Sequence, residues 1–372
     1  MKEIPAPFEV PDRLLMGPGP SNVHPRVLRA MSKPVIGHLD PVTLSMLNEI
    51  QGMLRDLLRT DNELTYPVSG TGTAGMECAL TSILEPGDPV VILVSGFFAA
   101  RMREIARRLG ASVITLGDRW GEPVAPEEVA GALDEHPDAK ALLTVHGETS
   151  TGLHQPLPEL GDLCRRRDVL FVVDAVATFG GMELDVDGWG IDVCYAGSQK
   201  CLSAPPGLAP ITFSPKAFRV MESRRQPPPS FYLDAMLIKG YVGSERLYHH
   251  TAPVSTLYAL HEALRLVLQE GLEERWRRHE EIGSELLGAL EQRGFHPVPP
   301  EGHRMPQLAA VWLPEGFEDR PNRERLLREF GIEVAGGLGE FAGKVWRVGV
   351  MGESCTRDNV KIFTEALDQL LA

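Results

Sequence analysis

The feature that most constrains the fold is a regular alternation of strand-like and helix-like segments between residues 64 and 214. Short apolar runs bounded by turn residues predict seven strands: Leu64–Val68, Val90–Val94, Ser112–Leu116, Ala141–Val145, Val169–Val173, Asp192–Ala196 and Ala209–Phe213. Helices are predicted between them, near residues 74–84, 97–109, 126–135 and 157–167. This alternation predicts an α/β fold with a mainly parallel, doubly wound central sheet, in which ligands bind at the carboxyl ends of the strands. The loops expected around that crevice are residues 69–73, 95–98, 146–151, 174–176 and 198–200.

Two of these strand ends carry a lysine and an aspartate. Lys200 lies in the stretch Gly197–Gly207, among small residues and just after a predicted buried strand, and Asp174 closes the strand before it. By residue type alone, a solvated loop lysine is the more common case. The two strand ends meet at one edge of a parallel sheet, however, and an enzyme that uses pyridoxal phosphate needs this pair. The amine forms a Schiff base, and the acid binds the protonated pyridine nitrogen.

A glycine-rich turn, Ser69–Gly75, joins a predicted strand to a predicted helix. Its glycines let the backbone approach a ligand, the first amides of the helix bind anions, and the hydroxyls of Thr71 and Thr73 add donors. The turn also matches the dinucleotide pattern through Gly70, Gly72 and Gly75, so a nicotinamide-dependent dehydrogenase is the alternative from another class. That pattern requires an acidic residue about 20 positions on, where Ser95 stands. We therefore favour a cradle for a single phosphate, and a plain turn stays possible on this motif alone.

Further candidates follow other predicted strands. Phe98 would lie flat on a planar cofactor or simply pack in the core. In His146–Gly152, hydroxyl groups such as that of Thr149 would reach a phenolic oxygen, or Glu148 and Thr149 would only cap the loop. Arg347 interrupts an apolar strand, which indicates either a structural salt bridge or a bidentate clamp for a substrate carboxylate. The adjacent His249 and His250 have no third ligand at a useful spacing, so we expect no metal site.

Composition excludes several classes of function. A formal net charge of −14 argues against a nucleic-acid partner, because phosphate backbones are bound by clustered lysine and arginine. The apolar runs are too short to span a bilayer, and the residues from Met1 to Pro5 lack the core of a signal peptide, so no membrane partner is expected. Five cysteines without a CxxC pair fit a reducing, cytoplasmic location.

Three parts of the chain are expected. They are an N-terminal arm (1–22), a large cofactor-binding α/β domain (23–254) and a smaller C-terminal α+β domain (255–372). Residues 224–254 are predicted to be irregular. A helix capped by Ser255 and a final helix capped by Thr356 are predicted after them.

Six ordered motifs extend over nearly the whole chain: SGTGTAGME (69–77), HGETSTG (146–152), VDAVATFGG (173–181), GSQKCLSAPPG (197–207), YHHTAPV (248–254) and GGLG (336–339). With them the chain resembles the class V aminotransferases of pyridoxal phosphate fold type I, and within these the alanine–glyoxylate and serine–pyruvate branch. The resemblance implies transfer of an amino group from a small amino acid, alanine or serine, to a 2-oxo acid, glyoxylate or pyruvate.

The resemblance also implies roles for individual residues. Lys200 would form the Schiff base, Asp174 would pair with the pyridine nitrogen, Val176 would pack under the ring and Thr149 would lie near its hydroxyl. Phe98 stands where the family commonly has a stacking tryptophan. The phosphate would be held by Thr71, Gly72, Thr73 and Gln199. Arg347 would bind the substrate carboxylate. Tyr248 and Thr251 would reach the phosphate of a neighbouring subunit, which implies a homodimer with shared active sites.

Other reactions stay open at this stage. Ureidoglycine–glyoxylate aminotransferase is the nearest alternative, although Tyr248 is closer to the alanine–glyoxylate pattern, and 2-aminoethylphosphonate–pyruvate aminotransferase is another. Cysteine desulfurases place a histidine just before the lysine, where this chain has Gln199. A catalytically inactive scaffold is disfavoured because Lys200, Asp174 and Arg347 are all present.

Overall fold

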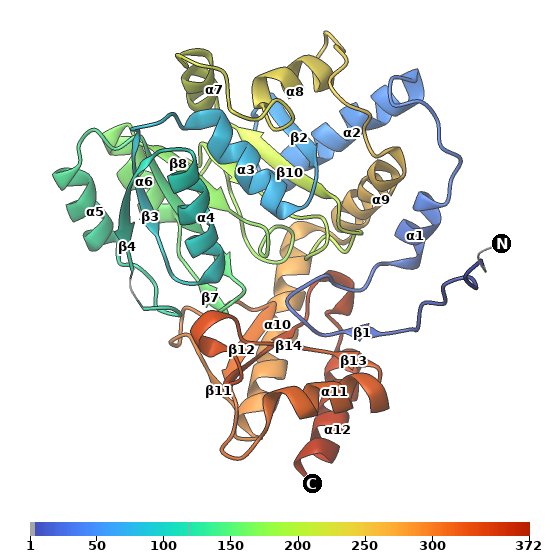
Figure 1. The fold of residues 1–372 in the computed structure, drawn as a ribbon. Helices are drawn as coiled ribbons and strands as arrows, with labels where there is room; N and C mark the ends of the chain where they lie inside the picture. The colour runs from blue at the N-terminus through green and yellow to red at the C-terminus, as the bar shows by residue number, and fades with distance from the viewer. Residues whose placement is uncertain (1–3, 118) are drawn as a thin grey trace.

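The computed structural model describes residues 4–117 and 119–372. A seven-stranded sheet forms the centre of the larger part of the molecule (Figure 1). In spatial order its strands are β2 (Leu64–Ser69), β10 (Leu208–Phe213), β9 (Val193–Tyr195), β8 (Leu170–Asp174), β5 (Ala141–Val145), β3 (Pro89–Leu93) and β4 (Ser112–Leu116). Only β10 runs antiparallel to its neighbours, so the prediction of a mainly parallel central sheet is confirmed.

Helices lie on both sides of this sheet (Figure 1). They are α1 (Pro25–Met31), α2 (Pro41–Leu58), α3 (Gly72–Ile83), α4 (Phe97–Arg108), α5 (Pro126–Glu135), α6 (Pro158–Arg167), α7 (Pro215–Glu222), α8 (Ala235–Val242) and α9 (Val254–Glu270). The main core fills the space between sheet and helices and includes Tyr66, Phe171 and Phe213, all fully or almost fully buried. Strands β5 and β8 are buried along their whole length, as expected for parallel strands covered on both faces.

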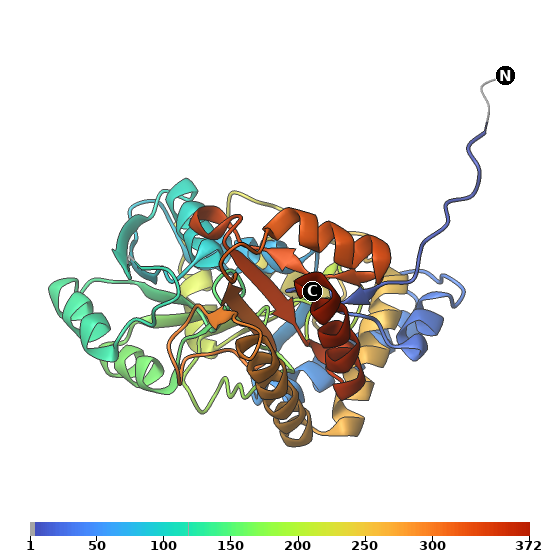
Figure 2. The same cartoon turned by 90° about the horizontal axis from the view of Figure 1, so that it is seen from below.

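The C-terminal part packs below the large sheet in Figure 1, and Figure 2 shows it from beneath. It contains α10 (Leu272–Glu291), α11 (Asp319–Glu329) and α12 (Arg357–Leu371). Its four-stranded antiparallel sheet has the order β11 (His296–Pro297), β12 (Leu308–Trp312), β15 (Val345–Gly349) and β14 (Ala335–Gly336). A second core lies between this sheet and the three helices, with Trp346 and Phe363 at its centre.

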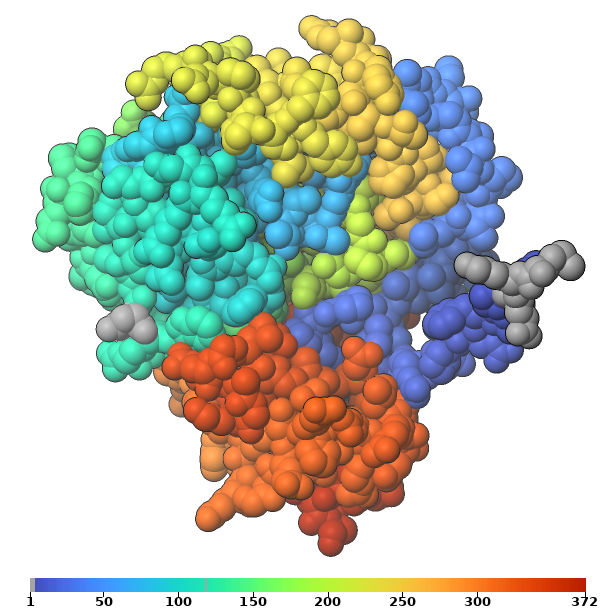
Figure 3. Space-filling view, viewed as in Figure 1, coloured from blue at the N-terminus to red at the C-terminus, as the bar shows by residue number. Residues whose placement is uncertain are grey.

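The N-terminal segment joins the two parts. Its strand β1 (Leu14–Leu15) pairs in parallel with β13 (Ile332–Glu333), and Met16 is buried in the smaller core. The chain then passes between the two parts toward α1, and Figure 3 shows this blue segment in contact with the orange C-terminal part. The expected arm is therefore anchored on the small domain, apart from residues 1–3, which lie outside the described part.

Some local predictions are wrong. Helix α9 begins at Val254, and the hydroxyl of Ser255 does not cap it. The segment predicted to be irregular contains α8, which Asp234 caps by accepting hydrogen bonds from the amides of Met236 and Leu237. Helix α9 packs on α1 and α2, so it belongs to the large core. The boundary between the two packed parts therefore lies after α9, one helix later than the predicted boundary at residue 254. The predicted cap at Thr356 is confirmed, because its side chain accepts a hydrogen bond from the amide of Asn359.

The described helices include none with the length and apolar composition that a transmembrane span requires.

Candidate active site

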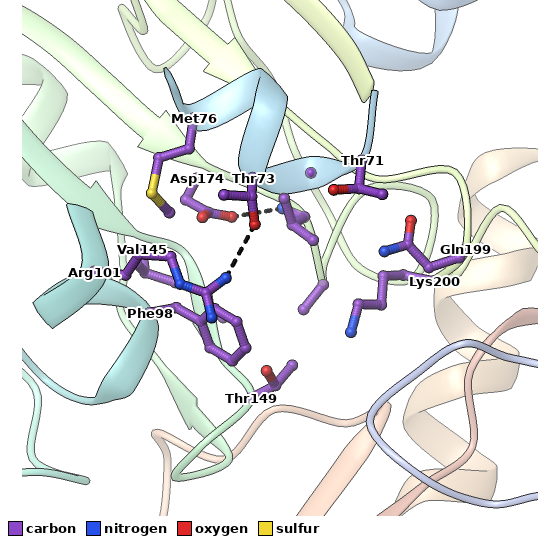
Figure 4. A pocket seen from close by; sticks show the side chains of 14 residues that line it. Thr71, Thr73, Met76, Phe98, Arg101, Val145, Thr149, Asp174, Gln199 and Lys200 are labelled. Atoms are coloured by element: carbon purple, nitrogen blue, oxygen red, sulfur yellow. Dashed lines mark hydrogen bonds between the residues drawn. The ribbon is translucent and has the colours of Figure 1, made fainter. Parts of the chain in front are cut away.

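A pocket opens at the carboxyl ends of the central strands, where the sequence predicted a crevice. Side chains from the five predicted loops converge on it (Figure 4). The lining residues are Thr71, Gly72, Thr73, Met76, Phe98, Arg101, Val145, Gly147, Thr149, Asp174, Val176, Ala177, Gln199 and Lys200. Every predicted site residue except Tyr248, Thr251 and Arg347 therefore lines one cavity.

Lys200 is buried in this pocket, with a relative exposure of 9%. Its ammonium donates a hydrogen bond to the carbonyl of Pro18. Burial, assisted by the positive charge of Arg347, lowers the pKa of Lys200 to about 8. A lysine in this condition is partly neutral near physiological pH, so it can act as a nucleophile and as a base.

The N-terminal segment forms the wall behind Lys200. The amide of Ser21 donates to the carbonyl of Gln199 at 3.0 Å, and its hydroxyl donates to the carbonyl of Lys200 at 2.8 Å. Gly19 has a φ of +97°, and a Cβ there would lie 2.5 Å from Cδ of Lys200. Only glycine meets both the backbone and the space requirements at this position. The N-terminal segment, which is anchored on the small domain, thus lies directly against the lysine.

Asp174 closes β8 on the same cavity and is buried. Its Oδ1 accepts a hydrogen bond of 2.8 Å from the amide of Val176. Burial raises the pKa of Asp174 to about 7, since few donors compensate the loss of water. A buried acid in this state gains from a cationic partner, which favours the charged carboxylate.

The glycine-rich turn leads from β2 into α3, whose first residues are Gly72 and Thr73. The first amides of an α-helix have no partner within the helix, so they are available to an anion. A Cβ on Gly72 would lie 2.9 Å from a methyl group of Val176, which explains why the turn has glycine there. Beside this turn, Oε1 of Gln199 is buried without a hydrogen-bond partner among the described residues.

Glu148 and Arg101 support the walls of the site. The sequence indicated Glu148 only as a cap of its loop, and it did not single out Arg101. Glu148 is fully buried and caps α4, because its Oε2 accepts from the amides of Phe98 and Ala99 at 2.9 and 3.0 Å. Its Oε1 accepts from the amide and hydroxyl of Ser150. Burial raises the pKa of Glu148 from its ordinary value. The only signal for Glu148 in the sequence was its position just after a predicted strand. That position does not show whether the side chain caps a helix or contacts a bound ligand.

Arg101 organises the opposite wall. It donates to the hydroxyl of Thr73 at 3.0 Å, and its guanidinium lies 4.9 Å from the ring centroid of Phe98. Phe97 meets the ring of Phe98 edge to face at 5.6 Å. Phe98 therefore lines the pocket as a ring held on two sides.

Arg347 is buried on β15, just outside the lining of the cavity. Its Nε donates to the carbonyl of Gly336 at 2.8 Å, and Nη1 lies 3.5 Å from the carbonyl of Thr149, which lines the pocket. Among the described residues no carboxylate lies within 4 Å of the guanidinium, so the salt-bridge alternative is wrong. Burial lowers the pKa of Arg347 to about 10, and the more distant carboxylate of Glu148 offsets only part of this effect.

Tyr248 and Thr251 lie away from the pocket of their own chain. Tyr248 is 66% exposed and packs against His38, and Thr251 is also exposed. Between them, His249 and His250 bind each other through Nδ1 atoms 2.8 Å apart, and Nε2 of His250 lies 2.7 Å from the hydroxyl of Ser69. The predicted reach of Tyr248 and Thr251 to a second subunit stays a prediction.

Comparison with known proteins identifies the family. The family model of the class V aminotransferases matches residues 14–347 of this chain. The chain is 41% identical to the (S)-ureidoglycine–glyoxylate transaminase of Bacillus subtilis, over 97% of this chain and 91% of that protein. It is 42% identical to the alanine–glyoxylate aminotransferase of Rattus norvegicus, over 98% of this chain and 89% of the relative. The crystal structure of an alanine–glyoxylate aminotransferase from Nostoc sp. superposes with a TM-score of 0.97 at 46% identity, covering 100% of this chain and 98% of the other.

The chain belongs to the class V aminotransferases and has the fold of the type I pyridoxal phosphate enzymes. It is a transaminase of the branch that contains the alanine–glyoxylate enzymes.

The family implies pyridoxal phosphate as cofactor, and the pocket fits this group. The free amides at the start of α3 suit a phosphate, and rotation of the Gln199 amide would present Nε2–H where its buried, unpartnered oxygen now lies. Asp174 is a buried acid without a cationic partner within 4 Å among the described residues, as a protonated pyridine nitrogen would require. Phe98 and Val176 supply apolar surfaces for an aromatic ring.

Proposed function

We propose that this transaminase uses pyridoxal phosphate and transfers the amino group of a small amino acid, with alanine preferred, to glyoxylate. The observation that carries the proposal is the buried guanidinium of Arg347, which is close enough to Lys200 to lower its pKa and has no carboxylate partner among the described residues. A substrate carboxylate would satisfy it. Relatives with two different amino donors share glyoxylate in their names, which supports this acceptor.

The residues of the chain divide the work. The cofactor, when bound, supplies an aldehyde that takes up the amino group and a protonated ring that withdraws electrons from Cα. Lys200 in its neutral form would remove the proton from Cα of the amino donor and would hold that proton on Nζ until it is returned. Arg347 holds the substrate carboxylate and thereby orients the Cα–H bond. Asp174 keeps the ring nitrogen protonated.

Steady-state assays with a matrix of donors and acceptors test this proposal. The donors are alanine, serine, aspartate, glutamate, (S)-ureidoglycine and 2-aminoethylphosphonate, and the acceptors are glyoxylate, pyruvate and 2-oxoglutarate. We expect the highest kcat/KM for alanine with glyoxylate. A clear preference for 2-oxoglutarate, or for the phosphonate donor, would overturn the substrate assignment while leaving the transaminase chemistry intact.

Ureidoglycine is the second candidate donor. It is supported by the Bacillus relative, which is as similar to this chain as the alanine–glyoxylate enzymes are. The matrix decides between the two donors, because each is offered with glyoxylate at equal concentration. A cytoplasmic location stays a prediction.

We also propose a homodimer with shared active sites. Phe231, Leu247 and Tyr248 leave 67%, 58% and 66% of their surfaces exposed within one chain, and contact with a second subunit would cover such side chains. A mixing experiment tests the sharing. Tyr248→Phe is expected to bind the cofactor weakly, and Lys200→Ala is expected to be inactive. Subunits of the two variants, mixed and re-associated, are expected to recover turnover at limiting cofactor, because one site of each mixed dimer is then intact. No recovery despite mixed dimers would contradict shared sites.

A second prediction concerns the carboxylate clamp. Arg347→Lys is expected to raise the KM of the amino donor about 10- to 100-fold, because a point charge replaces a two-pronged donor worth about 1.5–3 kcal/mol. Arg293→Lys is a matched control, since Arg293 forms a surface ion pair with Asp368 of the same domain. Steady-state kinetics of both variants provide the measurement. A KM unchanged in Arg347→Lys would show that the carboxylate binds elsewhere.

A further inference from the structure

A compact group of charged residues lies where α9 meets α10, away from the lining of the pocket. At its centre, the carboxylate of Glu270 accepts hydrogen bonds from Arg278, through Nε at 2.6 Å and Nη2 at 3.1 Å. The other partner is Nη1 of Arg275, which donates to Oε2. Gly271 makes the sharp turn between the helices with a φ of +86°. One carboxylate thus holds two guanidinium groups side by side.

Arg275 points into the large domain. Its side chain is 7% exposed, and its remaining donors bind two backbone carbonyls. Nε donates to Gly180 at 2.9 Å, and Nη2 donates to the carbonyl of Cys201. Cys201 directly follows Lys200, so this guanidinium fixes the peptide on one side of the reactive lysine. On the other side of Lys200, the amide of Ser21 donates to the carbonyl of Gln199 at 3.0 Å.

Arg278 points into the small domain. Its Nη1 donates to the carbonyls of Gly352 at 3.0 Å and Cys355 at 2.7 Å. These residues form the loop directly after β15, the strand that carries Arg347. His279 adds to this connection, because its Nε2 accepts from the amide of Gly352 at 2.9 Å while Nδ1 donates to the carbonyl of Arg275 at 2.8 Å.

The two loops also touch each other. The amide of Glu353 donates to the hydroxyl of Ser203 at 2.7 Å, and a Cβ on Gly352 would lie 2.0 Å from that hydroxyl. Ser203 has a φ of +53°, which a non-glycine residue adopts only when its surroundings impose it. The loop of Lys200 and the loop after Arg347 are therefore locked together, with Glu270 as the common anchor.

A purely stabilising role would not explain which groups are bound. Buried ion pairs contribute little net stability, because the cost of removing charges from water offsets their attraction. What they supply is a defined geometry. Here the geometry ends on the peptide next to Lys200 and on the loop next to Arg347, the two groups that must hold the same substrate at a fixed spacing.

We propose that Arg275 and Arg278, joined through Glu270, are positioning residues that separately set the place of the Lys200 amine and of the Arg347 guanidinium. The inference rests on the proposed function, since it assigns the two arginines to two steps of that reaction. Arg275 serves proton transfer through Lys200, and Arg278 serves binding of the substrate carboxylate through Arg347.

Kinetic constants of single variants test this division of roles. Arg275→Gln is expected to lower kcat about 10- to 100-fold with little change in the donor KM, as a small misplacement of a reacting group does. Arg278→Gln is expected to raise the donor KM about tenfold with kcat nearly unchanged. Arg277→Gln is the matched control, because Arg277 lies between them on α10 and only forms surface ion pairs with Glu274 and Glu281. It is expected to change neither constant.

A second readout does not depend on turnover. In the protein freed of cofactor, the rate at which an acylating reagent modifies Lys200 is followed against pH by mass spectrometry. Arg275→Gln is expected to move the midpoint upward, toward that of an ordinary lysine, because the loosened peptide exposes the amine. Arg278→Gln and Arg277→Gln are expected to keep the wild-type midpoint. Arg275→Lys, which retains a charged donor, is expected to restore part of the shift.

Each outcome decides the inference. Suppose that Arg275→Gln and Arg278→Gln lower kcat and raise the donor KM to the same extent, in proportion to a lowered melting temperature. The cluster would then have only a structural role, and the proposal would be overturned. Behaviour of Arg275→Gln like that of Arg277→Gln would also overturn it. If either arginine variant fails to fold, Glu270→Gln replaces it, and the expected result is a smaller change in both constants together with a shifted midpoint. A wild-type protein without transaminase activity would contradict the proposed function, whereas the acylation profile would still test the placement of Lys200.

Discussion

Replacement of Lys200 by alanine is expected to lower transaminase turnover on the order of 10⁴-fold. Lys200 contributes the only amine among the residues that line the described pocket. The other basic group there, the guanidinium of Arg101, donates to the hydroxyl of Thr73 and has no acceptor atom for the Cα proton. No neighbour can therefore take over the base, and the covalent attachment of the cofactor is lost at the same time.

Three measurements check this expectation. Borohydride treatment is expected to leave the mass of the reduced cofactor on the wild-type peptide that contains residue 200, and not on the variant. Turnover of Lys200→Ala is expected to recover partly when a small primary amine is added, because the amine can occupy the space of the missing side chain. Lys361→Ala, on the exposed face of α12, serves as the control for loss of a lysine and is expected to behave as wild type. Full activity of Lys200→Ala would refute the assignment.

Much of the large domain could be predicted from the sequence because its strands are locally encoded. Each strand of the central sheet is an apolar run bounded by turn residues, and the structure places every one of them within a residue or two of the predicted bounds. The order of strands was not predictable from such runs. Strand β10 inserts antiparallel between β2 and β9, and this pairing depends on contacts between residues far apart in the chain.

Local errors have local causes. The short helix α8 has only eight residues inside a segment rich in glycine and proline neighbours, so periodicity did not reveal it. Ser255 was chosen as a cap because it precedes an apolar pattern, but the helix begins one residue earlier, where Val254 already packs against the core.

The pocket itself could be predicted because parallel strands present their carboxyl ends at one edge. That rule alone gathered Thr71, Asp174 and Lys200. It could not show that Glu148 caps α4 or that Arg275 binds the carbonyl of Cys201. Those hydrogen bonds join residues about 50 and 74 positions apart. Nothing in the residues near Glu148 or Arg275 specifies the partner.

The second large effect is expected for Asp174→Asn, which should lower kcat about 100- to 1,000-fold. The amide cannot stabilise positive charge on the ring nitrogen, so the ring withdraws fewer electrons when the Cα proton is removed. The variant is still expected to bind the cofactor, because the phosphate cradle and Lys200 are intact. Absorbance of the bound cofactor and steady-state kinetics measure the two effects separately. An unchanged kcat would exclude Asp174 as the partner of the ring nitrogen.

The same variant is expected to be more stable than the wild type when the cofactor is absent. Burial raises the pKa of Asp174 from 3.8 to about 7. Between these values the folded protein keeps a proton on Asp174 that the unfolded chain has lost, so the contribution of Asp174 to stability falls as the pH rises from about 4 to 7 and stays lowered above that. The penalty at pH 8 is on the order of 4 kcal/mol. Asparagine never ionises, so its melting temperature should lack this decline.

Glu148→Gln gives the contrast that makes the stability test specific. Glu148 is a second buried acid, on the loop that carries Thr149, and its carboxylate accepts four hydrogen bonds from the start of α4 and from Ser150. Asp174 has fewer donors, the amide of Val176 and the nearby hydroxyl of Tyr195. An amide in place of Glu148 would set an N–H group against donors, so this variant is expected to melt lower than the wild type at pH 8. Melting curves of the three cofactor-free proteins from pH 4 to 8 should therefore diverge in opposite directions. If the melting temperature of Asp174→Asn does not rise relative to that of the wild type from pH 4 to 8, Asp174 is compensated in the free protein, and its role would then not require a cationic ring. If Asp174→Asn is more stable than the wild type only when the cofactor is absent, the carboxylate of Asp174 serves the reaction although it lowers the stability of the free protein.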